Sequence, residues 1–177
     1  MSDVEIRVAS AADLIAITEI YQHAVLFGTA TFELDPPDVA EMTGRFESLI
    51  SGGFPYFVAA QDGRPVGYAY AGPYRLRPAY RFTVENSIYL APAVQHRGIG
   101  TALLQRLIAE SEARGFRQMI GIVGDSANAG SIGVHSKTGF QMIGTHPNVG
   151  FKFGRWLDTV MMQRALGEGA KTLPAES

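Results

Sequence analysis

The sequence predicts an α/β (α+β) domain with a mixed, mostly antiparallel central sheet flanked by helices. Residues 87–108 begin with the alternating pattern of a strand, pass through a glycine-rich turn and continue as an amphipathic helix. Two further apolar runs, 56–60 and 65–71, flank Gln61-Asp-Gly-Arg64, which is typical of a tight hairpin turn. The apolar run 117–124 is typical of a buried strand.

The first elements follow from local signals. Alternation over residues 4–8 predicts an edge strand. Ser10-Ala-Ala-Asp13 forms a capping box that satisfies free N–H groups at a helix start, so we expect a helix to about Leu26. A second helix should open at Asp35-Pro-Pro37, because proline is tolerated in a first turn, and end at Gly52-Gly53.

The rest of the chain alternates between strands and helices. Residues 82–91 are predicted to form the central strand. Gly115 is a suitable C-cap for the helix that follows this strand. A short helix is expected over 128–138, and the last two strands over 140–145 and 157–165. The total is about seven strands and about four helices.

Length and composition fit one domain. A chain of 177 residues can bury roughly 70% of the surface that its unfolded form exposes, and 46% apolar residues is ordinary for a globular protein. We expect a single domain over 4–166. The polar segment 167–177 has no periodicity and should be a mobile tail.

Charge and residue content exclude several classes of protein. A net charge of -2 argues against a nucleic-acid-binding protein, which usually carries a strongly basic face. Without cysteine there is no disulfide framework and no thiolate nucleophile or metal ligand. The histidines show no metal-ligand spacing. No apolar run approaches the ~18 residues of a membrane span and the first residues carry no signal pattern, so we expect a cytoplasmic protein.

The turn Gln95-His-Arg-Gly-Ile-Gly100 indicates a ligand. Its glycines leave N–H groups uncovered at a helix start, where the helix dipole favours an anion such as pyrophosphate, and Arg97 adds a cation. A plain strand-to-helix turn has the same pattern. A dinucleotide fingerprint fits in part, with Asp125 as its ribose acid, but Leu103 occupies its third glycine position. No Gly-Lys-Ser/Thr closes a P-loop.

Two other stretches carry chemistry by residue type. Glu85 lies on the central strand between apolar neighbours, where a carboxylate is either paired with an arginine or poised to accept a proton. The segment 72–81 is the most cationic part of the chain. Its arginines form either a solvated loop or a clamp for a carboxylate.

These segments resemble the GNAT superfamily of N-acetyltransferases. Gln95–Gly100 is similar to its Gln/Arg-x-x-Gly-x-Gly/Ala pyrophosphate loop, and Asn128–Phe140 to its Asn-x-x-Ala-x-x-Leu-Tyr-x-Lys-x-Gly-Phe block. Marks of the phosphinothricin and methionine-sulfoximine acetyltransferase branch are Thr31-Phe-Glu33, Tyr70-Ala-Gly-Pro73, Thr83-Val-Glu-Asn-Ser87 and Phe151-Lys-Phe-Gly-Arg-Trp-Leu-Asp158. The likeness runs from about Ile6 to Met162.

The resemblance implies a GNAT fold that binds acetyl-CoA as co-substrate, with no metal. A backbone amide near Leu90, where the central strand separates from its neighbour, would polarise the thioester carbonyl, with Ile88 and Tyr89 beside it. Asn128 and Ser131 match positions that contact the pantetheine arm, although Asn128 also fits a plain N-cap. The pyrophosphate contacts would come from Gln95, His96, Arg97, Gly98, Ile99, Gly100 and Thr101.

The reaction implied is direct acetyl transfer to the amino group of a small amino-acid-like acceptor of the phosphinothricin, methionine-sulfoximine or methionine-sulfone type. Glu85 would accept the proton of the ammonium. His135 stands where the family usually has a tyrosine general acid, and it either protonates the leaving thiolate, hydrogen-bonds the cofactor or does neither. Tyr89 is the other candidate donor. The acceptor would contact Phe32, Arg75, Arg77, Tyr80, Arg81, Glu85 and Lys152.

The resemblance also favours a homodimer. Residues 151–158 crowd aromatic and cationic side chains into what should be an exposed connection between the last two strands. The alternative is that Trp156 folds back on its own core. Competing hypotheses for the whole chain are a protein or peptide N-acetyltransferase, a non-catalytic acyl-CoA sensor and a nucleotide-binding module. Glu85 speaks against a pure sensor, and the arginine-rich loop favours a small anionic acceptor.

Overall fold

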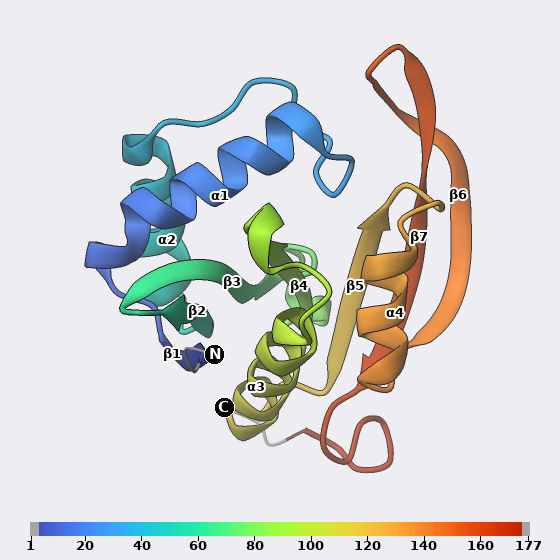
Figure 1. Ribbon diagram of the computed structural model, residues 1–177. Helices are drawn as coiled ribbons and strands as arrows, with labels where there is room; N and C mark the ends of the chain where they lie inside the picture. Colours follow the sequence, from blue (N-terminus) through green and yellow to red (C-terminus); the bar gives the residue numbers. More distant parts are fainter. Residues whose placement is uncertain (1–3, 175–177) are drawn as a thin grey trace.

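A computed structural model describes residues 4–174, which form one seven-stranded sheet with helices on both faces (Figure 1). The strands are β1 (Val4–Val8), β2 (Tyr56–Gln61), β3 (Arg64–Pro73), β4 (Thr83–Leu90), β5 (Gln118–Gly124), β6 (Gln141–Lys152) and β7 (Arg155–Ala165). The helices are α1 (Leu14–Phe27), α2 (Val39–Ser51), α3 (Ile99–Ala113) and α4 (Ala129–Lys137). The strand order is β1-β2-β3-β4-β5-β7-β6, and within residues 4–174 only β4/β5 is parallel. The predicted mixed, mostly antiparallel sheet with four helices is confirmed.

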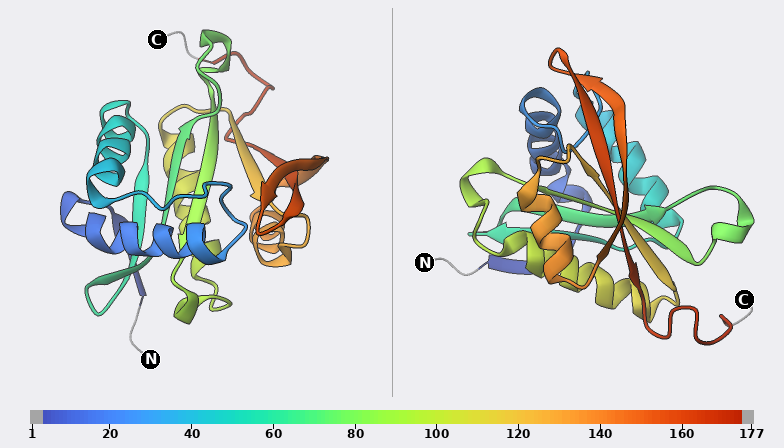
Figure 2. Two further views of the ribbon diagram at one scale, coloured as in Figure 1. Left: turned by 90° about the horizontal axis from the view of Figure 1, so that it is seen from above. Right: turned by 90° about the vertical axis from the view of Figure 1, so that its right-hand side faces the viewer.

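Alternating strand residues supply two cores, one for each helical layer. On β2, Phe57 and Ala59 pack in the cluster that contains the leucines of α3, whereas Tyr56 and Val58 pack with α1 and α2. Figure 2 shows α1 and α2 together on one side of the strands. Because side chains alternate along a strand, both faces of β2 are apolar.

The β4/β5 ladder is short, and the sheet splits beyond it. The two strands pair only from Thr83 and Gln118 to Asn86 and Gly121, although both continue further. Past this point β4 stays paired with β3 and β5 stays paired with β7. The facing edges of β4 and β5 therefore separate into a V.

The first helix begins as predicted, and the second begins later. Asp13 accepts hydrogen bonds from the N–H and the hydroxyl of Ser10, at 2.8 and 3.0 Å, before α1 starts. The prediction that α2 opens at Asp35-Pro-Pro37 is wrong, because its N-cap is Asp38, whose carboxylate accepts from the N–H of Glu41 at 2.8 Å. A residue that precedes proline is disfavoured in the α region, so the prolines keep the chain extended before the helix.

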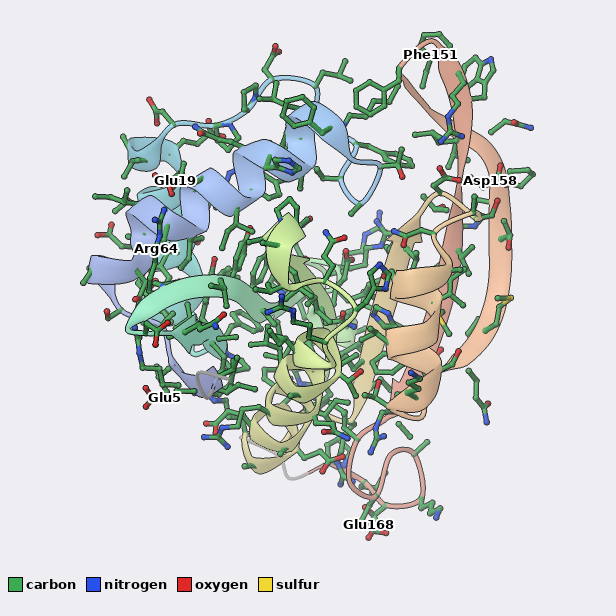
Figure 3. All side chains as sticks on the ribbon, in the orientation of Figure 1. Glu5, Glu19, Arg64, Phe151, Asp158 and Glu168 are labelled. Atoms are coloured by element: carbon green, nitrogen blue, oxygen red, sulfur yellow. The ribbon has the colours of Figure 1, made fainter. Side chains whose placement is uncertain are left out.

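The last two strands are longer than predicted. Both β6 and β7 extend into residues 151–158, so this segment is the end of a hairpin and not a free connection. Its turn is Phe153-Gly154, with φ of 52° and 72°, the left-handed pair that a two-residue type I′ turn requires. A register shift between His146 and Gly150 interrupts the pairing of β6 with β7. The alternating pattern of a strand is therefore not continuous in the sequence of β6. Figure 3 places Phe151 at the far end of the hairpin, away from the body of the sheet.

The chain after β7 contacts Arg117, the residue just before β5. The side chain of Arg117 donates to the carbonyls of Gly169 and Leu173 and to the hydroxyl of Thr172, at 3.5, 2.9 and 2.9 Å. Residues 175–177 of the expected tail lie outside the described residues, and the mobility of 167–177 stays a prediction. Along residues 4–174, no helix is long and apolar enough to cross a bilayer.

Asp13 should stabilise the fold in a pH-dependent way. Its side chain is 4% exposed and accepts two hydrogen bonds from Arg7, at 2.7 and 2.8 Å, which lower the pKa of Asp13 to about 2. Since an unfolded aspartate titrates near ~3.9, this stabilisation is present above about pH 5 and is lost as the pH falls toward 2. Asp13→Asn should lower the free energy of unfolding by about 2 kcal/mol at pH 7 and by much less at pH 2, in urea denaturation.

The matched control is Glu19→Gln. Glu19 pairs with Arg64 at 2.7 Å, but both side chains are exposed, so its loss should cost less than about 1 kcal/mol. An equal loss of stability in Asp13→Asn at both pH values would contradict the prediction.

Candidate active site

Two cavities open where β4 and β5 separate. The inner pocket has a volume of about 220 Å³ and lies between β4, β5 and residues 30–32. The outer cleft has a volume of about 940 Å³ and extends past the end of α1, the loop before α3 and the start of α4. Ile88, Tyr89, Asn128 and Ser131 line both, so the two cavities meet there.

Backbone donors of β4 face the split. The carbonyl of Thr83 and the N–H of Ala91 are bonded on the β3 side, whereas the carbonyl of Phe82 accepts from residues entering β5. Backbone groups alternate between the two sides of a strand, so the N–H groups of Ile88 and Leu90 point toward β5. Because β5 has left the ladder by then, these two donors face the cavities.

The loop before α3 has the conformation of an anion site. Gly98, the N-cap of α3, has a φ of 82°, and His96 has a φ of 60°. Left-handed residues interspersed with ordinary ones turn successive N–H groups into one concave surface. The outer cleft is lined here by Gln95, His96, Gly98, Gly100 and Thr101. Of the other two expected contacts, Arg97 is exposed outside this lining, and the side chain of Ile99 is buried in the core.

Glu85 is the carboxylate of the inner pocket. It is half-buried on β4, and burial raises its pKa, while the charge of Arg75 acts in the opposite direction. A carboxylate with a raised pKa is a better proton acceptor for an amine than an exposed one. The position predicted from the sequence therefore has the environment of a base.

His135 reaches the inner pocket from α4, and both of its ring nitrogens have oxygen partners. Nδ1 lies 2.8 Å from the Ser131 carbonyl, and Nε2 lies 3.0 Å from Oδ1 of Asn86. The residue is 5% exposed, and burial lowers its pKa. His135 is thus a fixed part of the pocket wall and not a surface histidine.

The ring of Tyr89 packs into the core beside α1. It meets Tyr21 edge-on, with ring centres 4.9 Å apart, and lies 5.4 Å from Tyr68. Burial raises the pKa of Tyr89 well above its usual value. A phenol that holds its proton so strongly is a weak acid, which makes Tyr89 a poor general acid at neutral pH.

Lys152 anchors the loop that closes the inner pocket. Its ammonium is buried and donates to the carbonyls of Gly28 and Thr31, both at 2.9 Å. The resemblance places Lys152 against the acceptor, but here its donors are directed at the main chain. Phe32, from the same loop, lies so close to Gly150 that an added Cβ there would come within 2.3 Å of the ring. The hairpin therefore fixes the Phe32 wall of the pocket.

The other expected acceptor contacts lie apart from the inner pocket. Arg75, Arg77, Tyr80 and Arg81 are exposed on the loop between β3 and β4, which projects from the body (Figure 2). Within the described residues 4–174, none of these four lines either cavity. Of the four, Arg75 influences Glu85 through its charge.

Sequence reasoning missed Asn86 and Gly121. Asn86 is 6% exposed, donates from Nδ2 to the Ile120 carbonyl at 3.1 Å, and holds His135 with its oxygen. The sequence does show a polar residue directly after Glu85 in the central strand. Because successive side chains of a strand point to opposite faces, Asn86 had to lie on the face opposite to Glu85. Gly121 gave no local signal, because its role depends on a residue from another element.

Fold and site together define a class of protein. A split sheet with strand-edge donors, beside an anion-binding loop at a helix start, is suited to hold an acyl thioester and its pyrophosphate. The sequence model of the Acetyltransferase (GNAT) family matches residues 17–140, and the chain belongs to this family. The protein is an acetyl-CoA-dependent N-acetyltransferase with the GNAT fold.

Similar proteins cover nearly the whole chain. Phosphinothricin N-acetyltransferase of Alcaligenes faecalis is 52% identical over 169 residues, which are 96% of this chain and 86% of the relative. An L-methionine sulfoximine/L-methionine sulfone acetyltransferase of Salmonella typhimurium is 42% identical over 165 residues, 93% of this chain and 96% of the relative. The crystal structure of a phosphinothricin acetyltransferase from Sinorhizobium meliloti in complex with AcCoA has a TM-score of 0.96 at 50% identity, covering 100% of this chain and 95% of the other.

Removing the Lys152 anchor should loosen the loop selectively. Lys152→Met keeps most of the buried stem but deletes the two hydrogen bonds to Gly28 and Thr31. We expect faster amide hydrogen exchange over residues 28–33, with exchange in β2 unchanged, because local opening depends on local contacts. Lys171→Met, at an exposed lysine, is the control and should change neither region. Unchanged exchange over 28–33 in Lys152→Met would argue against the anchor.

Proposed function

We propose that this acetyltransferase acetylates the amino group of a small amino-acid-like acceptor of the phosphinothricin, methionine-sulfoximine or methionine-sulfone type. The observation that carries the proposal is the inner pocket, which contains Glu85 and opens to the outer cleft beside Ile88 and Tyr89. Its volume of about 220 Å³ suits a small acceptor better than a protein segment. The names of the relatives point to the same class of acceptor.

The outer cleft fits the co-substrate. Its left-handed Gly98 directs N–H groups into the cleft, and an added Cβ at that position meets no other atom within 4 Å. We assign the pyrophosphate to this loop and the pantetheine arm to Asn128 and Ser131, which line both cavities. When bound, acetyl-CoA supplies an activated acetyl group. Within residues 4–174, no group of three or more acidic or histidine side chains could hold a metal ion.

Glu85 acts as the base in this proposal. An ammonium cannot attack a carbonyl until it loses a proton, and Glu85 is the carboxylate that lines the inner pocket. Its raised pKa brings it closer to the working pH. The amine then attacks the acetyl carbon directly, since the chain has no cysteine to carry the acetyl group.

The backbone of β4 stabilises the charge that develops during transfer. The N–H groups of Ile88 and Leu90 face the gap, and pairing of the other edge of β4 with β3 keeps them in place, so they need no reorganisation as negative charge grows on the thioester oxygen. His135 borders the same pocket, where its contacts with Asn86 and the Ser131 carbonyl fix the ring.

The direct test is a thiol-release assay. Purified protein is mixed with acetyl-CoA and a panel of amino acids with their sulfoximine, sulfone and phosphinate analogues, and free CoA thiol is measured. Release with the analogues but not with a peptide amine supports the proposal. Release only with a peptide or protein would favour a protein N-acetyltransferase, and binding of acetyl-CoA without release would favour a sensor.

Three further expectations belong to the proposal. Residues 4–166 act as one N-acetyltransferase domain, and the enzyme works in the cytoplasm. It also works as a homodimer, for which the support is the end of the β6–β7 hairpin: Phe151, Phe153 and Trp156 are 57%, 56% and 62% exposed there. Aromatic residues of this kind are favoured in buried interface centres. Two-fold symmetry would bring the hairpin of each protomer to the partner.

Substitution of Gly98 should weaken acetyl-CoA binding specifically. Gly98→Val forces a branched side chain into a left-handed conformation and into the cleft, so we expect the Kd for acetyl-CoA to rise about tenfold or more in calorimetry. Gly53→Val is the matched control, because Gly53 has a similar φ of 77° and lies outside both cavities. Both variants should lose some stability. Equal Kd values for the two variants would contradict the assignment of the pyrophosphate to this loop.

Glu85→Gln should remove the base while keeping its shape. We expect kcat to fall about 10²–10⁴-fold with acetyl-CoA affinity nearly unchanged, and the acidic limb of kcat/KM to disappear. In an enzyme that keeps Glu85, Arg75→Ala should move the acidic limb of kcat/KM to higher pH, because the charge of Arg75 lowers the pKa of Glu85. Arg77→Ala, an exposed neighbour, should leave the limb in place. A Glu85→Gln variant with the original pH profile would exclude the base role.

Assembly should depend on the end of the hairpin. Phe153→Ala with Trp156→Ala removes exposed aromatic surface, so the protein should shift from dimer to monomer in analytical ultracentrifugation. Acceptor binding should weaken more than acetyl-CoA binding. Ile15→Ala, at a residue that is 64% exposed on α1, is the control and should sediment as the wild type does. A wild-type protein that is monomeric at micromolar concentration would end the dimer proposal.

A further inference from the structure

The inner pocket ends at Asn86 and His135. Both side chains line it, whereas Gly121, which faces Asn86 in the last pair of the β4/β5 ladder, is not part of the lining that residues 4–174 form. The ring of His135 covers this glycine, since an added Cβ at 121 would come within 2.6 Å of both Cδ2 and Nε2. The imidazole therefore occupies the space that would otherwise extend the pocket to the end of the ladder.

The ring of His135 is held on several sides. Nδ1 lies 2.8 Å from the Ser131 carbonyl, and Nε2 lies 3.0 Å from Oδ1 of Asn86. Phe140 is buried and meets the imidazole edge-on, with ring centres 5.0 Å apart. Asn86 is fixed in turn, because its Nδ2 donates to the Ile120 carbonyl at 3.1 Å. Turning the imidazole away would break these contacts, so His135 forms a rigid wall.

The surface that this wall presents suits an alkyl group. Both ring nitrogens are directed at protein oxygens, so neither is directed at the contents of the pocket. The residue is 5% exposed, and burial lowers the pKa of His135, so the ring is neutral at neutral pH. A neutral ring whose nitrogens are engaged is a favourable neighbour for a methyl group and a poor one for a charge.

The direction of the acyl chain follows from the donors of β4, and this step rests on the proposed function. The N–H groups of Ile88 and Leu90 face the gap and would bind the thioester oxygen, while the loop before α3 would hold the pyrophosphate at the outer cleft. The carbonyl carbon of a thioester is planar, and its oxygen, sulfur and acyl chain point in different directions. With the oxygen at β4 and the sulfur toward the outer cleft, the acyl chain is directed at β5 and the end of the ladder.

We propose that His135 is a specificity-determining residue that limits the acyl donor to a short chain. The methyl group of the acetyl donor ends against the ring, and a further methylene would collide with it. Asn86 is the positioning residue that holds the wall, and Gly121 leaves the space in which the ring stands.

The two substrates are thus selected on opposite faces of β4. Glu85 and Asn86 are consecutive on the strand, so their side chains leave it on opposite faces, although both line the inner pocket. The amine acceptor meets Glu85, and the acyl chain meets the wall that Asn86 holds. A change of size at His135 should therefore alter the choice of acyl donor and leave the order of preferred acceptors as it is.

A rigid wall discriminates between chains that differ by one methylene. Extra volume in a closely packed site forces neighbouring groups to shift, and these neighbours are held by the contacts described above. Discrimination of about 10–200-fold for one methylene is typical of such pockets. The imidazole is larger than a methylene, so its removal should make space for a propionyl chain.

The first experiment needs no variant and no turnover. Calorimetry gives the Kd of the wild-type protein for acetyl-CoA, propionyl-CoA and butyryl-CoA in the absence of an acceptor. We expect Kd to rise about tenfold or more from acetyl-CoA to propionyl-CoA and to rise again for butyryl-CoA. Equal Kd values for the three would overturn the proposal, because a wall at the end of the acyl chain must affect binding.

The second experiment changes the size of the wall. In His135→Ala, the kcat/KM for propionyl-CoA relative to acetyl-CoA should rise about tenfold or more, and the ratio of the two Kd values should change in the same direction. His135→Leu keeps most of the volume without the nitrogens, so it should keep the preference for acetyl-CoA. Thr159→Ala is the control: Thr159 lines the same pocket but pairs with Gly124, further along β5, and its loss should leave both ratios unchanged.

Several outcomes would overturn the proposal. If His135 acted through its own acid–base chemistry, kcat would fall alike in both His135 variants without a change in the preference among acyl donors. An equal gain of propionyl-CoA use in His135→Leu or Thr159→Ala would show a loosened pocket and not a wall. If His135→Ala does not fold, the wild-type series and His135→Leu decide.

Failure of the proposed function gives a different result. A wild-type protein that binds none of the three thioesters would contradict the proposed function together with the wall. Normal acetyl transfer with equal affinities for the three thioesters would contradict the wall alone.

Discussion

The early end of the β4/β5 ladder is the constraint on which the site depends. Had the two strands stayed paired to their ends, the N–H groups of Ile88 and Leu90 would be used within the sheet and no pocket would open beside Glu85. A buried strand edge is normally costly, because its donors lose water without gaining partners. Here that cost leaves a row of fixed donors where a substrate can use them.

The walls of the site come from parts of the chain that are distant in sequence. Lys152, near the end of the hairpin, holds carbonyls of the loop that follows α1, and Gly150 leaves room for the ring of Phe32. Gly121 on β5 leaves room for His135 from α4. In each case a missing side chain or a buried donor on one element sets the position of a side chain on another. The pocket is therefore a product of the whole fold.

Local features were predictable from the sequence, and non-local ones were not. The loop Gln95–Gly100 and the carboxylate of Glu85 were found because a glycine-rich helix start and a charged residue within a central strand are visible in a short window. The inward direction of Lys152 was missed, because its partners lie more than a hundred residues away in the chain. Asn86 was missed for the same reason, since its meaning comes from His135 and Ile120.

The position of Trp156 makes the protein its own optical reporter. It is the only tryptophan in the sequence, it is 62% exposed, and it meets Phe151 at the end of the hairpin. The tyrosines of the core lie in a separate cluster: Tyr21, Tyr56, Tyr68, Tyr70 and Tyr89. Emission excited selectively in the indole therefore reads the solvent contact of the hairpin.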